Sequence, residues 1–490
     1  MYKILLHGIT NKYEMQELIK VFLSPDMFVS YTDAEAEAAA DLEAKYENGN
    51  LAAGGTQPAE IAAPAAQPIL LEINQVLSAD KNEIKREIYR KLAAVTGYEP
   101  EWGILTGVRP VKLAGELLDR LQDMEAVRRT LREDYLLAES KIDLLTDTLA
   151  YQREVCGKAD PDSVGVYIGI PFCPTRCLYC SFTSNQVPDA EIARYLEALK
   201  QEIAYVGRRM QETGLWAESI YIGGGTPTSL SAAQLRQLMG TVRDCFDLSA
   251  IVEYTVEAGR PDCTDAEKLA VIKEYGATRI SINPQTFSDE VLANIGRRHS
   301  AQDILDCYAE ARAAGHDDIN MDLIAGLPGD TVEGFEKSLR QAIALDPENI
   351  TVHTLTLKRA SRIVIEDQKE NDYADVAAML EKCHLLAEAG YRPYYLYRQK
   401  NTLQNLENVG WCKPGHEGYY NIYIMEEVQT ILSAGAGGST KLVADGGKRM
   451  QRIFNFKYPT EYIQRFDEVL ERKKGVAEFY DHNLGTETTG

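Results

Sequence analysis

Through the middle of the chain, short runs of apolar and β-branched residues alternate with longer stretches that repeat at helical spacing. Six of the short runs predict strands, at residues 166–172, 219–222, 253–257, 279–283, 319–324 and 350–356. Capping-box spacing marks helix starts at residues 231–234 and 264–267, with a looser version at 300–303. Gly276 and Gly315 stand where helix ends need a left-handed residue. The pattern therefore predicts six successive βα units.

Six βα units predict an α/β fold, with a parallel sheet and helices outside it. Because six strands are too few to close an eight-stranded barrel, we expect a partial (β/α)6 barrel over residues 158–360. Sheets of this kind bind ligands at the carboxyl ends of their strands, so the residues that follow each strand are where we expect the chemistry.

The flanking segments have a different pattern. Residues 1–157 predict a small N-terminal α+β domain, with strands at 4–6 and 68–77 and helices at 15–22 and 85–96. Residues at about 34–68 are mostly Ala, Glu, Gly and Pro. They have too few large apolar side chains for burial to offset the entropy lost on ordering the chain, and we expect a mobile loop there. Residues 361–490 are expected to form a C-terminal α/β cover domain.

Composition narrows the possible partners and location. The chain has 490 residues, 45% of them hydrophobic, and a formal charge of −22, which argues against a nucleic-acid partner because phosphates need clustered Lys and Arg. No run of about 18 apolar residues occurs, and we expect neither a membrane span nor a signal peptide. The odd number of nine scattered cysteines favours reduced thiols, and we expect a cytoplasmic location and a monomer.

Three of the nine cysteines come directly after the first predicted barrel strand, as Cys173-Pro-Thr-Arg-Cys177-Leu-Tyr-Cys180. Three thiolates suit a [4Fe-4S] cubane that leaves one iron open to a chelating ligand. Structural zinc usually closes four ligands, and no fourth partner stands nearby, since Cys156 precedes the strand and Phe182 follows the triplet. A cluster is therefore favoured over zinc and over three unrelated core cysteines.

Glycine and polar residues follow the other predicted strands. The second strand ends in Gly223-Gly-Gly-Thr-Pro227, where a ligand could approach backbone N–H groups without side-chain obstruction. Glu257 closes the third strand, Gln285 follows the fourth, Arg297 comes twelve residues later and Asp322 lies in the fifth. Each alone is more often a solvated or paired group. Together they offer carboxylates for ribose hydroxyls or an ammonium group, and a guanidinium for a carboxylate.

Four strings carry a family resemblance: Val166-Tyr-Ile-Gly-Ile-Pro-Phe-Cys173 with the cysteine triplet, Gly223-Gly-Gly-Thr-Pro227, Asn283-Pro-Gln-Thr-Phe287 and Met321-Asp-Leu-Ile-Ala-Gly-Leu-Pro328. Together they resemble the oxygen-independent coproporphyrinogen III oxidase family of the radical S-adenosylmethionine (SAM) superfamily, most closely its HemZ-type coproporphyrinogen dehydrogenases. The resemblance covers about residues 160–470. It implies a [4Fe-4S] cluster held by Cys173, Cys177 and Cys180, with SAM on the open iron.

The resemblance also implies the residues that hold SAM. Contacts to the cluster-bound SAM are implied for Tyr167, Gly224 and Glu257. A second SAM is implied at seven further positions, namely Tyr179, Gly225, Thr226, Gln285, Arg297, Asp322 and Thr356. The cofactor carries the hard chemistry in such enzymes, and no catalytic side chain is required.

The implied reaction is the anaerobic oxidative decarboxylation of two propionates of coproporphyrinogen III to vinyl groups, giving protoporphyrinogen IX in haem (porphyrin) biosynthesis. It implies an electron donor such as flavodoxin or ferredoxin, and an electron acceptor that the sequence does not identify. Residues 391–400, rich in Tyr and Arg, are candidates to line the pocket, and Lys358, Arg359 and Arg362 to meet the propionates. A mixed surface strand explains the same residues almost as well. The glycine-rich residues 432–440 resemble the segment that returns to cover the barrel.

Departures from the family pattern leave two alternatives open. The family usually has histidine where this chain has Gly169, and the best-known oxidases have cysteine where it has Phe182. The haem-chaperone branch carries H-N-x-x-Y-W, whereas the corresponding stretch here is Tyr420-Asn-Ile-Tyr-Ile-Met425, and His416 just upstream is more simply a loop histidine. The alternatives are a haem-binding carrier that keeps the cluster and a radical SAM enzyme for another acidic tetrapyrrole.

Overall fold

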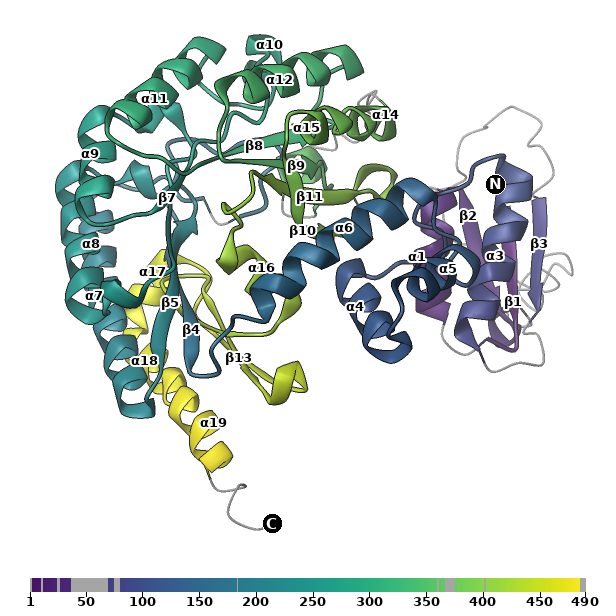
Figure 1. Cartoon of the computed structure of the whole chain (residues 1–490), viewed down its shortest axis with the longest axis horizontal. Coiled ribbons are helices and arrows are strands. Elements are labelled where there is room, and N and C mark those ends of the chain that lie inside the picture. The colour runs from purple at the N-terminus through teal and green to yellow at the C-terminus, as the bar shows by residue number, and fades with distance from the viewer. Residues whose placement is uncertain are drawn as a thin grey trace, which may run out of the picture. The chain divides into compact units, whose positions relative to one another are not determined.

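The computed structural model describes residues 2–9, 12–23, 27–36, 69–74, 80–182, 184–358, 361–365, 375–400 and 402–484. The chain divides into two compact units, Met1–Thr146 and Asp147–Gly490, which run from purple to blue and from blue to yellow in Figure 1. The loop expected at about 34–68 lies outside the described residues, apart from its first three. The domain boundaries expected at 157 and 360 stay predictions.

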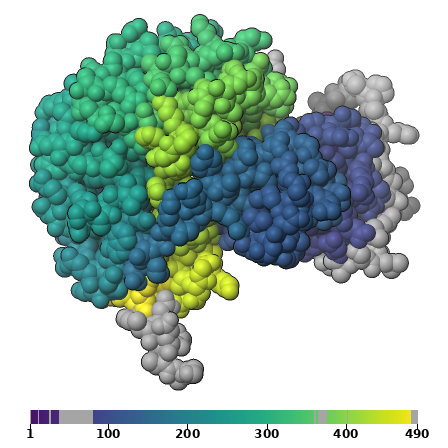
Figure 2. Space-filling view, in the orientation of Figure 1, coloured from purple at the N-terminus to yellow at the C-terminus, as the bar shows by residue number. Residues whose placement is uncertain are grey.

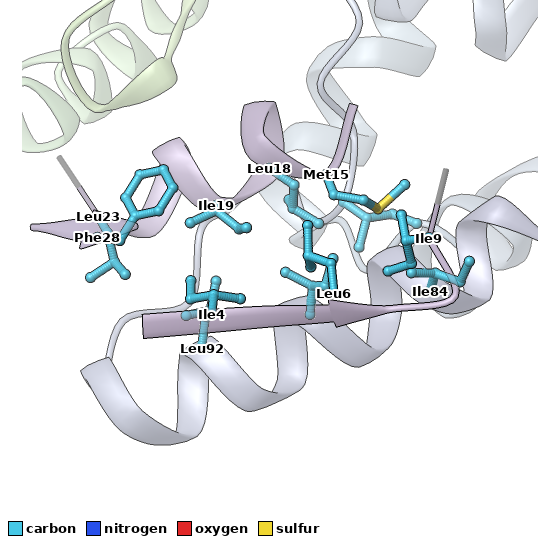
Figure 3. Packing of buried hydrophobic residues seen from close by; sticks show 12 residues of the cluster. Ile4, Leu6, Ile9, Met15, Leu18, Ile19, Leu23, Phe28, Ile84 and Leu92 are labelled. Carbon is cyan, nitrogen blue, oxygen red and sulfur yellow. The ribbon is translucent and has the colours of Figure 1, made fainter. Parts of the chain in front are cut away.

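The first unit is built on a three-stranded parallel sheet in the order β2-β1-β3. Its elements are β1 (Tyr2–His7), α1 (Lys12–Phe22), β2 (Phe28–Thr32), β3 (Ile69–Asn74), α3 (Lys81–Thr96), α4 (Pro110–Leu121) and α5 (Met124–Glu133), and α6 (Glu139–Cys156) continues into the second unit. Ile4 and Leu6 alternate along β1 and pack with Met15 and Leu18 of α1 and Ile84 of α3 (Figure 3). This unit therefore has a hydrophobic core of its own.

The second unit is built on one eleven-stranded sheet in the order β10-β11-β9-β8-β7-β6-β5-β4-β12-β13-β14. In chain order, the first six strands of this sheet are β4 (Ser163–Ile170), β5 (Trp216–Gly224), β6 (Glu253–Glu257), β7 (Arg279–Ser281), β8 (Ile319–Ala325) and β9 (Asn349–Thr354). All six pair in parallel with their neighbours in chain order. The six predicted βα units and the α/β class are confirmed, with strand ends displaced by up to three residues.

Helices follow these strands and form the outer layer of the unit, a continuous teal to green wall in Figures 1 and 2. They are α7 (Asp189–Thr213), α8 (Ala232–Cys245), α9 (Ala266–Glu274), α10 (Asp289–Asn294), α11 (Ala301–Ala313) and α12 (Val332–Leu345). Among the described helices, none is long and apolar enough to cross a membrane.

The predicted helix ends are largely confirmed. Ser231 and Ser300 form reciprocal capping boxes, and Gly276 and Gly315 have φ of 89° and 86°. The cap expected within 264–267 is wrong by one residue. Asp265 is the N-cap of α9, because its carboxylate accepts from the Lys268 N–H.

The last part of the chain adds its strands to the same sheet. These are β10 (Arg392–Arg398), β11 (Glu407–Cys412), β12 (Thr430–Ala434), β13 (Ser439–Ala444) and β14 (Arg449–Phe454), with helices α13 (Arg362–Ile365), α14 (Val376–Glu381), α15 (His384–Glu388), α16 (Tyr419–Glu426), α17 (Pro459–Gln464), α18 (Phe466–Lys473) and α19 (Gly475–Leu484). β12 pairs in parallel with β4. At Gly435 a Cβ would lie 2.5 Å from the Gly169 carbonyl oxygen, so the glycine allows this close return.

Candidate functional site

The three motif cysteines lie on the loop that follows β4. The Cys173 N–H donates to the Asn185 carbonyl at 3.3 Å, which anchors the start of the loop. Cys177 is buried, whereas Cys173 and Cys180 are half-buried. The Cys173 Sγ lies 3.4 Å from the Thr226 hydroxyl, beyond the end of β5. The loop therefore meets the neighbouring glycine-rich turn.

Among the described residues, no three His, Cys, Asp or Glu side chains converge on one point, as a single bound metal ion requires. A cubane cluster makes no such demand, because each of its thiolates binds a different iron.

The glycine-rich turn after β5 packs closely against the cysteine loop. A Cβ on Gly225 would lie 2.5 Å from the Phe172 carbonyl oxygen, and Gly224 has φ of 108°. The Gly225 N–H donates to Ile170 at 2.7 Å and the Thr226 N–H to Phe172 at 2.8 Å. These two N–H groups therefore hold the backbone that leads into the cysteines and are not open to a ligand, while Gly224 and Gly225 still line the cavity described below.

Glu257 ends β6 with its carboxylate inside the sheet. The Tyr221 hydroxyl donates to Oε1 at 2.6 Å. The pKa of Glu257 is raised to about 7, mainly by burial and also by the charge of Asp322. Hydrogen bonds from Tyr221 and the Gly224 N–H oppose this shift. A carboxyl group that titrates near neutrality at the end of a strand is a candidate for ligand binding.

Three tyrosines form a stack beside Glu257. The rings of Tyr167 and Tyr221 lie 6.2 Å apart and nearly parallel, and Tyr420 of α16 stacks on Tyr221 at 4.6 Å. Burial raises the pKa of Tyr167 well above its usual value, so its hydroxyl stays protonated. Tyr221 is not among the site residues predicted from the sequence. The sequence pattern that could have found it is the two-residue period of a strand, because Tyr221 precedes Gly223 by two positions and therefore lies on the same face of β5.

Gln285, four residues beyond β7, lies beside Asp322 in the middle of β8. Gln285 has φ of 68°, a left-handed conformation that is rare outside glycine. Its N–H donates to the Asp322 carbonyl at 2.8 Å, and its own carbonyl accepts from Ile324 at 3.0 Å. The Asp322 carboxylate accepts from Asn320 at 2.8 Å and lies 3.7 Å from the His353 Nε2. Backbone strain of this kind clusters at functional sites.

Arg297 is buried beneath the cysteine loop. Its guanidinium donates to the Asn283 carbonyl at 2.7 Å, the Gly259 carbonyl at 3.2 Å and the Tyr179 hydroxyl at 3.2 Å. Within the described part of the chain, its Nε has no hydrogen-bond partner, nor does the buried Oδ1 of Asn283. Arg297 thus reaches the cysteine loop through Tyr179.

In the second unit, residues from several strands of the sheet line a cavity of about 640 Å³. Nine residues of the predicted site line it: Tyr167, Tyr179, Cys180, Gly224, Gly225, Glu257, Gln285, Asp322 and Thr356. Four others, Cys173, Cys177, Thr226 and Arg297, lie outside its lining. Glu253 and Glu257, the first and last residues of β6, both line the cavity, so it extends along the whole strand.

The predicted pocket residues divide into two groups. Tyr395 and Tyr397 line the cavity, as does Lys358, whose ammonium lies 5.7 Å from the centre of the Phe182 ring. Arg398 does not line it and donates to the Asn405 carbonyl at 2.8 Å. Arg362 is not part of the lining either, and Arg359 lies outside the described residues.

His416 belongs to the opposite end of the sheet. Its Nδ1 lies 3.0 Å from the carboxylate of Asp318, which precedes β8, and its carbonyl accepts from Arg279 at 2.8 Å. The simpler interpretation of His416, as a loop residue, is consistent with these contacts.

Comparisons with known proteins agree with this geometry. Residues 167–342 match the model of the radical SAM superfamily. The chain is 41% identical to the oxygen-independent coproporphyrinogen-III oxidase-like protein HemZ of Bacillus subtilis, over 80% of each chain. It is 30% identical to the heme chaperone HemW of Escherichia coli, over 61% of this chain and 76% of that protein. Coproporphyrinogen III oxidase (HemN) of Escherichia coli has a similar fold, with a TM-score of 0.51, 24% identity, and coverage of 64% and 71% of the two chains.

Radical SAM proteins use a [4Fe-4S] cluster and SAM, and the residues present fit both groups. Three cysteines share one loop, and Cys180 lines the cavity together with Glu257. The unpartnered Asn283 Oδ1 and Arg297 Nε offer an acceptor and a donor near that loop. The sequence match over most of the length, the fold and this site agree, and the chain belongs to the radical SAM superfamily, in the family of oxygen-independent coproporphyrinogen III oxidase-like proteins.

Proposed function

We propose that the protein catalyses the anaerobic oxidative decarboxylation of coproporphyrinogen III to protoporphyrinogen IX in haem biosynthesis. The observation that carries this proposal is the cavity, which combines an aromatic wall with a lysine at the cysteine end. Its volume of about 640 Å³ lies within the range of ligand pockets. The name of the HemZ relative supports the same substrate.

The wall of the cavity suits a large ring with apolar faces. Tyr221 and Tyr420 stack on one side, and Tyr395 and Tyr397 stack at 6.0 Å within β10. Their hydroxyl groups can meet the pyrrole N–H groups, while their rings pack against the macrocycle.

Lys358 supplies a cation for a propionate. It is the one lysine among the described lining residues, and its ammonium lies against the Phe182 ring rather than a described carboxylate. The other lining cation, Arg279, is already 3.2 Å from Asp318. Burial lowers the pKa of Lys358, against the influence of Cys180, so a carboxylate partner would stabilise its charged form.

The proposed cofactor contacts follow the same geometry. Cys173, Cys177 and Cys180 would hold the cluster, and Tyr167, Gly224 and Glu257 the SAM on its open iron. Tyr179, Gly225, Thr226, Gln285, Arg297, Asp322 and Thr356 would hold a second SAM. Thr226 and Arg297 do not line the cavity, so their part in this set is through neighbours such as Cys173 and Tyr179.

When bound, the cluster and SAM supply the one-electron chemistry that removes a hydrogen atom from the substrate. Each propionate then loses that hydrogen atom, carbon dioxide and one electron to become a vinyl group, so the reaction needs an electron donor and an acceptor. The chain's residues would orient the propionate towards the cysteine end and exclude water from it. An electron donor such as flavodoxin or ferredoxin, a monomeric state and a cytoplasmic location stay predictions.

The test is an anaerobic assay with the reconstituted protein, SAM, a reductant and coproporphyrinogen III. We expect protoporphyrinogen IX together with 5′-deoxyadenosine. Cleavage of SAM with an unchanged porphyrinogen would contradict the oxidase proposal and favour a radical SAM enzyme for another acidic tetrapyrrole. Stoichiometric haem binding without turnover would instead favour a haem carrier, the function that the HemW relatives' names suggest.

A further inference from the structure

Arg260 lies behind the cysteine loop, at the start of the turn that follows β6. It is 3% exposed, does not line the cavity, and its guanidinium contacts Thr175 and Cys177 of the loop. One terminal nitrogen lies 3.8 Å from the Cys177 Sγ, within the range of a hydrogen bond to sulfur. Neither the composition nor the motif strings assign Arg260 a role.

A carboxylate fixes the orientation of this guanidinium. Its Nε and one terminal nitrogen donate to the two oxygens of Asp262, at 2.9 and 2.7 Å. The other terminal nitrogen donates to the Thr175 hydroxyl at 2.9 Å and to the Thr175 carbonyl at 3.1 Å, and faces Cys177. The bidentate pair holds the planar group in one position, so the contact to sulfur does not depend on a flexible side chain.

We propose that Arg260 is a positioning residue that raises the reduction potential of the cluster by donating a hydrogen bond to the Cys177 thiolate. The proposal rests on Cys177 as a cluster ligand and is independent of the substrate. Reduction adds one electron to the cluster and its thiolates. A buried cation that donates to a ligand sulfur stabilises this added negative charge, and such hydrogen bonds are among the terms that set cluster potentials.

The test is an anaerobic redox titration of the reconstituted full chain without SAM or porphyrinogen, followed by the electron paramagnetic resonance signal of the reduced cluster. We expect Arg260→Met to keep its iron and to have a midpoint potential more negative than that of the parent. Arg260→Lys keeps the positive charge without the planar fork, and we expect an intermediate potential.

Arg312→Met is the matched control. Arg312 also pairs with a carboxylate, since one of its terminal nitrogens lies 2.8 and 3.0 Å from the two oxygens of Glu348, but its partners lie near the start of β9. We expect this variant to be destabilised with an unchanged potential, so a general loss of stability is separated from tuning. Equal potentials in Arg260→Met and the parent would overturn the proposal.

If Arg260→Met loses iron, the test uses Arg260→Lys instead: a midpoint potential more negative than that of the parent supports the proposal, and an equal potential overturns it. Loss of iron in both variants would overturn tuning in favour of a role in holding the loop. A Cys177→Ala variant that keeps a full cluster would remove the premise, and neither result bears on the porphyrinogen assay.

Discussion

The two ends of the parallel strands both hold a buried arginine, but with different partners. At the end where the strands begin, Arg279 pairs with Asp318 at 3.2 Å and donates to the Asn349 side chain at 3.1 Å. At the cysteine end, Arg297 donates to backbone carbonyls and the Tyr179 hydroxyl, and no described carboxylate pairs with it. Arg260 at the cysteine end is also paired, with Asp262, so it is Arg297 that has charge left for a ligand there.

The carboxyl groups of the cavity show the same contrast. Burial raises the pKa of Glu253, but Arg279 and the Thr255 hydroxyl oppose that shift. Among the residues that the structure describes, no cation acts on Glu257, and burial raises its pKa to about 7. A buried charge with a partner is tolerated within a fold and becomes costly when that partner is removed, whereas buried charge that is not paired is retained mostly at functional sites. We therefore expect the paired groups to serve the fold and the unpaired groups at the cysteine end to bind the ligand.

The largest expected effect is at the cysteine end. Cys177→Ala should abolish the visible absorbance of the reconstituted cluster, because a cubane held by two thiolates loses its third protein ligand. The matched control is Cys412→Ala, which removes a buried thiol beside Asn349 at the opposite end. We expect its iron content and absorbance per folded molecule to equal those of the parent. Equal loss of absorbance in both variants would contradict the cluster assignment.

The next effect is on stability at the opposite end. Asp318→Asn leaves Arg279 buried without its nearest carboxylate, and we expect a loss of about 3 kcal/mol, or a thermal midpoint about 5 °C lower. SAM affinity and iron content of the folded protein should not change. Asp317→Asn is the control, since Asp317 is 93% exposed and lies 3.8 Å from Lys273. A fall in SAM affinity in Asp318→Asn would break the distinction between the two ends.

Much of the fold could be predicted from the sequence, because each βα unit carries local signals. β-branched runs predict the six strands, and Ser231 and Ser300 begin helices that need only nearby partners. The sequence predicts the cap one residue early, at Thr264, because threonine is also a favoured N-cap residue. In the structure the Thr264 hydroxyl donates to the Arg260 carbonyl instead, and Asp265 caps the helix. Local rules cannot choose between two adjacent capping residues.

The site was only partly predictable, because its contacts join distant parts of the chain. The cysteines and Glu257 stand out as motifs at strand ends, whereas the Tyr221 and Tyr420 stack joins residues about 200 positions apart. Arg260 reaches Thr175 across 85 positions. Such pairings follow from the order of strands in the sheet, and no spacing in the sequence encodes them.

A tenfold effect is expected at Glu257. In the folded protein its pKa is about 7, so the carboxylate that would bind the hydroxyl or ammonium groups of SAM forms only as the pH rises through this value. SAM affinity, measured by equilibrium dialysis of the reconstituted protein, should therefore increase from pH 6 to pH 8. The raised pKa of Glu257 also lowers stability as the pH rises from its usual value of 4.5 to about 7, because only the folded state still holds the proton there, and the loss is complete above that pH.

Glu257→Gln should lower SAM affinity about tenfold at pH 8 and remove its pH dependence, since an amide cannot ionise. Glu253→Gln is the matched control on the same strand, and we expect its SAM affinity and pH profile to follow the parent. A parent profile that is flat between pH 6 and pH 8 would argue against Glu257 as a SAM ligand.

The smallest expected effect is at Lys358, and it identifies which carboxylate the cysteine end attracts. Lys358→Met should weaken binding of coproporphyrin III, the stable oxidised form of the macrocycle, by roughly fivefold to tenfold, because one charge-assisted contact at a half-buried site is lost. Lys358→Arg should restore most of it, and Lys337→Met, which removes an exposed lysine of α12, should have no effect. Fluorescence titration measures each affinity. If Lys358→Met weakens the binding of SAM instead of the binding of coproporphyrin III, the lysine contacts the carboxylate of SAM, and the propionate contact proposed for it is wrong.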